Sequence, residues 1–295
     1  MMILIITHFY IISLFIKWYS FRMFTYIDPK VRQRLLERGK LVTINAEGEV
    51  IDDGDDPIKT TQSISILGPI PLPIKSATKN YNVSWYACVR RTELNKVEKL
   101  ANKLRDSDGK NSFAILASSM AVNSVLVLGD PDKWINPLVR VHSSCLTGDV
   151  FGSGRCECGP QLDMSLESIA KEEEGGMVVY MSGHEGRGIG LWAKAATYLL
   201  QDDGENTYQA NRSLGLDDDS RDFSDAAILI KYFYGTKKFR LLTNNPKKTD
   251  DLYAYGLENI TAVKHLIGVT DDNRDYLLAK RDWGHRLDEQ DLSKK

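Results

Sequence analysis

The chain has 295 residues, of which 42% are hydrophobic and 26% charged, and its formal net charge is −2. This composition is typical of a globular protein with one main domain plus an extension, and the near-neutral charge gives no global basic field, so we expect no nucleic-acid partner. The four cysteines are unevenly spaced, which excludes a disulfide framework. Thiols in this pattern fit a reducing compartment, and we predict a cytoplasmic location.

The first residues are unusually apolar, with no charge between Met2 and Ile16. The stretch is shorter than the roughly 20 residues of a membrane span, and it lacks the basic start and cleavage site of a secretory signal. Three interpretations remain: a membrane anchor, an extra element packed on the body, or a translated stretch upstream of a start at Met23. We favour the last and expect no membrane association, because motifs further along the chain need reduced thiols.

Next come a predicted helix at 31–39 and an acidic, turn-rich run at 47–57 that is typical of a surface or linker segment. We therefore divide the chain into an apolar extension at 1–22, a second extension or linker at 23–60 and a main domain at 61–290. Strands with one intervening helix follow. The strands are expected at 63–74, 83–91, 112–120 and 124–130, and the helix at 95–105.

Beyond Arg140, helices and strands alternate regularly. Helices are expected at 160–174, 189–202 and 222–235 and from Pro246 onward, with strands at 177–181 and 239–243. This alternation predicts an α/β fold, a three-layer sandwich in which helices cover both faces of a mixed sheet. Ligands of such folds gather where strands end.

Three of the four cysteines, Cys145, Cys156 and Cys158, lie within fourteen residues. Cys156 and Cys158 cannot easily form a disulfide with each other, but both can reach one ion. Buried structural cysteines are the alternative, yet these three lie among Gly, Arg, Glu and Asp rather than in an apolar run. Three thiolates would leave a fourth zinc position open for water, which is the catalytic arrangement. With His142 as a fourth ligand the site would be structural, although a neighbouring His more often supports such a site.

The segment 185–190, EGRGIG, follows a predicted strand and begins a helix. Free backbone N–H groups and the helix dipole favour phosphate there, and Arg187 adds a bidentate fork. Taken alone the turn is weak evidence, because an ordinary strand-to-helix connection has the same pattern.

A second strand end carries the segment 243–248, TNNPKK. Asn245 is the expected N-cap and Pro246 suits the first helical position. The two lysines that follow oppose the helix dipole unless an anion binds there, which singles out Lys248 more than Lys247. By contrast, the charged run at 217–223 has the pattern of a solvated loop. Tyr198 has the pattern of a surface residue on an amphipathic helix.

In this order the motifs resemble those of GTP cyclohydrolase II, the zinc enzyme that opens riboflavin synthesis, over roughly residues 64–286. The resemblance implies that Cys145, Cys156 and Cys158 bind one Zn²⁺ per chain. It implies catalytic roles for Asp219, Arg221 and Tyr198. It also implies nucleotide contacts from Arg140, Val141, His142, Ser143, Ser144, Gln161, Glu185, Gly186, Arg187, Thr207, Thr243 and Lys248.

The implied reaction opens the imidazole ring of GTP, releases formate and pyrophosphate, and leaves a diaminopyrimidinone ribosylamine phosphate. A homodimer is implied as well, and we expect Mg²⁺ to accompany the nucleotide. The family assigns the position of Asp219 as proton acceptor and that of Arg221 as nucleophile. Because a guanidinium stays protonated in proteins, stabilisation of the phosphoryl transition state is a simpler role for Arg221.

The chain departs from the family pattern at two places. Ser144 stands where the nucleotide loop usually has a carboxylate, and an unpaired guanine N–H would cost about 1 to 3 kcal/mol. Gly183 and His184 replace a basic residue and a glutamine before the EGR motif. Two alternatives therefore stay open: a paralogue linked to uracil breakdown, and a non-catalytic nucleotide-binding homologue.

Overall fold

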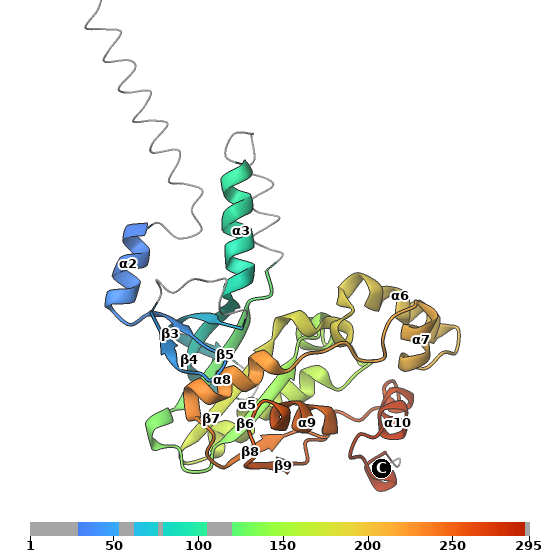
Figure 1. Cartoon of the computed structure of the whole chain (residues 1–295). Helices are drawn as coiled ribbons and strands as arrows, with labels where there is room; N and C mark the ends of the chain where they lie inside the picture. The colour runs from blue at the N-terminus through green and yellow to red at the C-terminus, as the bar shows by residue number, and fades with distance from the viewer. Residues whose placement is uncertain (1–28, 53–61, 76–78, 105–119, 293–295) are drawn as a thin grey trace, which may run out of the picture.

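The structure, a computed structural model, describes residues 29–52, 62–75, 79–104 and 120–292 (Figure 1). The apolar extension predicted at 1–22 and nearly all of the strand predicted at 112–120 lie outside these residues. In the described part of the chain, no helix combines the length and apolar character needed to cross a membrane.

The described residues form one mixed sheet of nine strands in the order β2-β1-β3-β4-β5-β7-β6-β8-β9. Neighbours from β2 to β7 pair antiparallel, whereas β7, β6, β8 and β9 run parallel. The strands are β1 (Leu41–Ile44), β2 (Val50–Ile51), β3 (Ile64–Lys75), β4 (Asn80–Arg90), β5 (Asn123–Gly129), β6 (Leu138–Ser143), β7 (Gly175–Met181), β8 (Phe239–Leu242) and β9 (Ile260–Val263).

Most helices begin and end within a few residues of the sequence-based expectation. The helices are α2 (Pro29–Glu37), α3 (Arg91–Leu104), α5 (Cys158–Lys171), α6 (Gly190–Asp202), α7 (Thr207–Ser213), α8 (Ser224–Tyr234), α9 (Pro246–Ala254), α10 (Arg274–Asp282) and α11 (Glu289–Leu292). Short helical turns occupy η1 (Pro131–Lys133), η2 (Leu146–Val150) and η3 (Ser182–Gly188). The Asn245 side chain accepts from Lys247 N, so the predicted N-cap of α9 is confirmed.

The side chains of β7 alternate between two separate apolar cores, as a strand covered on both faces requires. Met177 and Val179 are buried in the core that contains α8, whereas Val178 packs in the core that contains Ile169 of α5. The predicted three-layer α/β sandwich with a mixed sheet is therefore confirmed.

The sheet begins earlier in the chain than the boundary at residue 61 suggested. β1 pairs with β3 from Leu41 opposite Leu67 to Ile44 opposite Ile64, and β2 pairs with β1. Ile44 is fully buried in the larger core. The alternation of Leu41–Ile44 was too short a signal to reveal this strand, which is stabilised by its neighbours in the sheet.

The carboxyl ends of β6, β7 and β8 meet at one edge of the sheet, because these strands are parallel. The segments that leave this edge begin at Ser144, Ser182 and Thr243, and each carries a motif that the sequence had singled out. Helices α6, α7 and α10 gather at the same end of the molecule, where α7 contacts both α6 and α10 (Figure 1). The fold thus places all these motifs around one region.

Candidate active site

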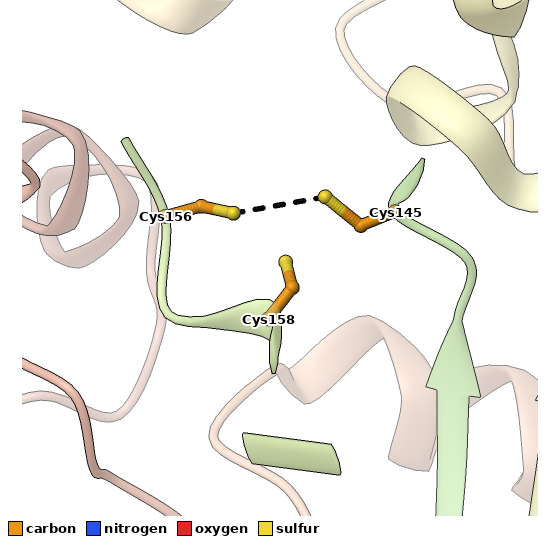
Figure 2. Close-up of side chains that lie close together, drawn as sticks. All are labelled: Cys145, Cys156 and Cys158. Atoms are coloured by element: carbon orange, nitrogen blue, oxygen red, sulfur yellow. Dashed lines mark hydrogen bonds between the residues drawn. The ribbon is translucent and has the colours of Figure 1, made fainter. Parts of the chain in front are cut away.

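Three thiols converge where β6 ends and α5 begins (Figure 2). The Sγ atoms of Cys145, Cys156 and Cys158 all lie within 4.8 Å of one another, with 3.6 Å between Cys145 and Cys156. Gly148 closes over them, and a Cβ at this position would lie 2.9 Å from Cys156 Sγ. The donor set and the absence of a side chain at residue 148 fit a zinc ion held by three thiolates.

The pKa values of the thiols are shifted in opposite directions. Hydrogen bonds from Cys156 and Cys158, together with the Lys194 ammonium 3.2 Å away, hold the pKa of Cys145 well below its usual range. Donation to Cys145 raises the pKa of Cys156 to about 12. The lowered pKa of Cys145 favours its thiolate, the form in which cysteine binds metal.

His142 supports this site and does not join the thiol group. Its Nε2 lies 3.1 Å from Asp149 Oδ1, and Asp149 also accepts from the Tyr180 hydroxyl and from Cys145 N. Burial lowers the pKa of His142 even though Asp149 opposes the shift. Of the two roles open for His142, the geometry favours the supporting one.

Lys194, a residue that the motifs did not single out, lies at the centre of the site. Its buried Nζ is 2.6 Å from Glu185 Oε1, 3.0 Å from Thr147 Oγ1 and 3.2 Å from Cys145 Sγ. Burial alone would lower its pKa, but Glu185 and Cys145 outweigh burial and raise it. One signal was present in the sequence: Lys194 is the single cation of the otherwise apolar helix α6.

Tyr198 lies one helical turn after Lys194 and lines the same cleft, so the pattern of a surface residue was misleading. Its hydroxyl is 3.1 Å from Thr147 Oγ1, which in turn lies 3.6 Å from Cys145 Sγ. The Arg155 guanidinium covers the ring at 4.7 Å from the centroid. Burial raises the pKa of Tyr198, so the phenol remains a proton donor at neutral pH.

A second group of side chains in the cleft lining is cationic, and we call this part of the lining the cation end. Arg140 donates to Leu242 O and Gln161 Oε1, and Lys248 donates to Val141 O at 2.8 Å. Burial lowers the pKa of Arg140 to about 10 and that of Lys248 well below its usual value. Within the described residues, neither cation has a carboxylate partner, so this end of the cleft is suited to an anion.

Arg187 is the third such cation. It is the one non-glycine residue of the described chain with a left-handed backbone, at φ 63°, between Gly186 and Gly188, which also have positive φ. Its two terminal nitrogens are buried and have no hydrogen bond of ordinary geometry among the described residues, although the Tyr276 side chain lies beside the guanidinium. A strained backbone and buried donors without a partner next to a cleft are typical of a ligand site.

Asp219 and Arg221 form a bidentate pair. Arg221 Nε lies 2.8 Å from Asp219 Oδ1 and Nη2 lies 2.5 Å from Oδ2, while Nη1 is 3.3 Å from Ser143 Oγ. Burial alone would raise the pKa of Asp219, but hydrogen bonds from Arg221 hold it below its usual value. The carboxylate therefore orients the guanidinium toward Ser143 at the end of β6.

One cleft contains most of the predicted site residues. Its lining includes Arg140, His142, Ser143, Ser144, Cys145, Cys156, Cys158, Gln161, Glu185, Gly186, Arg187, Tyr198, Thr207, Arg221, Thr243 and Lys248. Val141 is not in the lining, because its side chain is buried in the larger core and only its carbonyl faces Lys248. Asp219 is also outside the lining and contacts the cleft through Arg221.

The sequence model of GTP cyclohydrolase II matches residues 108–264, which is more than half of the chain. The chain belongs to the GTP cyclohydrolase II family. The match includes the thiol group, Lys194 and the three cations without carboxylate partners, and it ends before α10.

Curated relatives agree with this family. A riboflavin biosynthesis protein RibBA of Mycobacteroides abscessus is 54% identical over 172 residues, and a GTP cyclohydrolase-2 of Vibrio parahaemolyticus is 50% identical over 152 residues. A monofunctional riboflavin biosynthesis protein RIBA 3, chloroplastic, of Arabidopsis thaliana is 49% identical over 159 residues. These matches cover 56%, 51% and 54% of this chain, and 40%, 75% and 31% of the respective relatives. The chain thus spans less than half the length of two of these relatives.

The chain departs from the family pattern at Ser144 and His184, and both residues line the cleft. Ser144 uses its hydroxyl to donate to Ser182 O at 2.9 Å. His184 is buried between Ser143 Oγ at 3.3 Å and Asp222 O at 3.0 Å. Ser144 therefore changes the surface offered to a ligand. His184 joins the two segments that carry Ser143 and Arg221.

Proposed function

We propose that the chain hydrolyses GTP, opening its imidazole ring with release of formate and pyrophosphate, as the first step of riboflavin biosynthesis. The observation that carries the proposal is one cleft lined by two chemically different groups of side chains. One group is the three thiols, and the other is three cations without a carboxylate partner among the described residues. A nucleotide whose base meets a metal and whose phosphates meet cations fits this arrangement.

Cys145, Cys156 and Cys158 would hold one Zn²⁺, since they form the one thiol group of the described chain. When bound, Zn²⁺ supplies Lewis-acid chemistry and a hydrolytic nucleophile at neutral pH. His142 and Asp149 fix the loop that carries Cys145, because Asp149 accepts from Cys145 N.

Tyr198 is a proton donor close to the thiols. Its hydroxyl contacts Thr147, and Thr147 contacts both Cys145 and Lys194. From this position in the cleft the phenol would give its proton to the ring nitrogen as the C–N bond breaks. Lys194 holds the Glu185 carboxylate, which also accepts from Leu146 N at 2.7 Å and so ties the EGR segment to the cysteine loop.

At the cation end, Arg140, Arg187 and Lys248 would bind the triphosphate, together with Mg²⁺ carried by the nucleotide. Arg221, oriented by Asp219, would stabilise charge as pyrophosphate leaves. This role needs no deprotonated guanidinium. The resemblance further supports a homodimer, and the reduced thiols favour a reducing compartment such as the cytoplasm.

The decisive experiment measures formate release from GTP by the purified, zinc-loaded protein, with metal-stripped protein as the control. Formate production that depends on zinc is the expected result. GTP binding without formate would instead support the non-catalytic homologue. Turnover of a uracil-derived ureide or nucleotide in place of GTP would support the paralogue, for which the substitution at Ser144 leaves room.

A further inference from the structure

Helix α10 presents one face to the cleft, although it lies beyond the segment that matches the family model. Tyr276 and Lys280 are one turn apart and share a side of α10, and Trp283 follows directly after the helix as its C-cap. Leu277 points elsewhere, into a small core with Leu287 and Leu292. The segment is thus held by its own apolar contacts, which leaves the aromatic and cationic face free to serve the site.

This face fixes the position of Arg187. The Trp283 ring stacks on Tyr208 with 4.5 Å between centroids and 9° between planes. Tyr208 in turn lies under the Arg187 guanidinium at 3.9 Å, and Tyr276 lies 5.8 Å from it. Arg187 is therefore held by aromatic faces and leaves its terminal N–H groups unpaired.

Lys280 adds another cation to the same cavity. Tyr276, Lys280 and His285 line the cleft together with Arg187 and Lys248. The Lys280 ammonium pairs with the buried Glu157 carboxylate and lies 5.1 Å from the Tyr276 ring centroid. Burial, and then the charges of Lys280, Arg187, Arg221 and Lys248, lower the pKa of His285 to about 2.

We propose that α10 forms a wall of the substrate cleft, where Lys280 binds the phosphate chain of the substrate while Tyr276 and Trp283 position Arg187. That these phosphates belong to a nucleotide rests on the proposed function, whereas the phosphate pocket itself does not depend on it. Glu157 neutralises one charge of this pocket, whereas Arg140, Arg187 and Lys248 lack a carboxylate partner among the described residues, so a polyanion finds a net positive site.

The test measures the binding of inorganic tripolyphosphate and of GTP to the full-length, zinc-loaded chain by calorimetry. We expect Lys280→Met to weaken the binding of both by about tenfold, since a charged hydrogen bond is lost. The matched control is Arg281→Met, because Arg281 is the next residue on the helix and pairs with Asp282 at the surface. This control should bind both probes as the unchanged protein does.

Lys280→Met leaves Glu157 buried without its partner, so a second variant separates the two effects. Glu157→Gln/Lys280→Met removes both charges, and its affinity for tripolyphosphate should stay about tenfold weaker. Recovery of affinity in the double variant would show that Lys280 merely neutralises Glu157, and it would overturn the proposal. Unchanged binding in Lys280→Met, or no binding of either probe by the unchanged protein, would do the same.

The positioning role of the aromatic face has its own readout. Trp283→Ala should weaken tripolyphosphate binding by about threefold through Arg187, and Trp283→Phe should restore it, because a ring again stacks on Tyr208. Equal losses in both variants would reject this role. If the protein binds tripolyphosphate through Lys280 but releases no formate from GTP, the proposed function fails while the phosphate pocket stands.

Discussion

Two parts of the cleft lining differ in how their charges are balanced: the thiol end around Cys145, Cys156 and Cys158, and the cation end with Arg140, Arg187 and Lys248. At the thiol end, charged side chains have protein partners: Lys194 pairs with Glu185, and Asp149 accepts from the Tyr180 hydroxyl and from Cys145 N. At the cation end, Arg140 and Lys248 donate to carbonyl or amide oxygens, and the terminal nitrogens of Arg187 have no protein partner in the structure.

This difference indicates different tasks. A balanced network keeps its geometry without a ligand, which suits a site that must hold reacting atoms in place. An unbalanced group of buried cations costs folding free energy until an anion arrives, so it suits recognition of a charged ligand. The contrast predicts that changes at the thiol end abolish the chemistry, whereas changes at the cation end weaken binding.

The largest effect is expected from Cys156→Ser. Loss of one of three thiolates should reduce both zinc content and formate release by more than about a hundredfold, since changes to a supporting residue alone cost up to that much. Metal analysis and the formate assay measure this, and tripolyphosphate binding should persist. Cys88→Ala is the matched control, because Cys88 is buried in the apolar core away from the thiol group. Full activity without Cys156 would remove zinc from the proposed mechanism.

At the cation end, Lys248→Met should weaken GTP binding by about tenfold to a hundredfold, because a buried charged donor is lost. Zinc content should not change. The neighbouring Lys247→Met serves as control, since Lys247 pairs with Asp251 at 2.7 Å and lies outside the cleft lining. Equal losses in the two variants would mean that binding depends on the general field of the helix rather than on Lys248.

The sequence predicted residues of both ends, since the motifs singled out Arg187 and Lys248 as well as the three cysteines. Cys156 and Cys158 are two residues apart, so their proximity follows from local geometry, and the spacing alone indicated a metal site. The layers of the sandwich were predictable as well, because alternating apolar segments decide which faces are covered. Lys194 was missed because a single cation within helix α6 is a weak signal that belongs to no motif.

Residues contributed by tertiary contacts could not be predicted. Tyr276 and Lys280 reach the cleft only because α10 contacts α7, more than sixty residues earlier in the chain. The strand Leu41–Ile44 was hidden for the same reason, since its neighbour in the sheet begins at Ile64. Such placements depend on pairing across the fold, which local periodicity does not encode.

The pH dependence of stability gives a further test of the cation end. Burial, followed by the charge of Arg221, lowers the pKa of His184 from 6.5 to about 4. Between these values the unfolded chain binds a proton at His184 that the folded chain does not, so acid favours unfolding. Stability should therefore fall as pH drops from about 6.5 to about 4, with no contribution from His184 above that window.

Denaturant unfolding at several pH values measures this effect, and His184→Gln should show a smaller loss than the unchanged protein over the same window. Tripolyphosphate should reduce the loss, because a bound anion offsets Arg221 and Lys248 and raises the pKa of His184. Identical pH profiles for the two proteins would show that His184 is not held neutral by the cation end.

The smallest effect is expected at Ser144, which belongs to neither end. Its hydroxyl lines the cleft and donates to Ser182 O, so it offers a base little acceptor capacity. Ser144→Glu should lower the apparent KM for GTP by about threefold with kcat nearly unchanged, since a carboxylate accepts from a guanine N–H edge. Steady-state formate kinetics measure both constants, and Ser144→Gln tests whether the charge is needed. A KM that stays the same or rises would show that residue 144 does not meet the base, and the choice between GTP and another substrate would then rest on other residues.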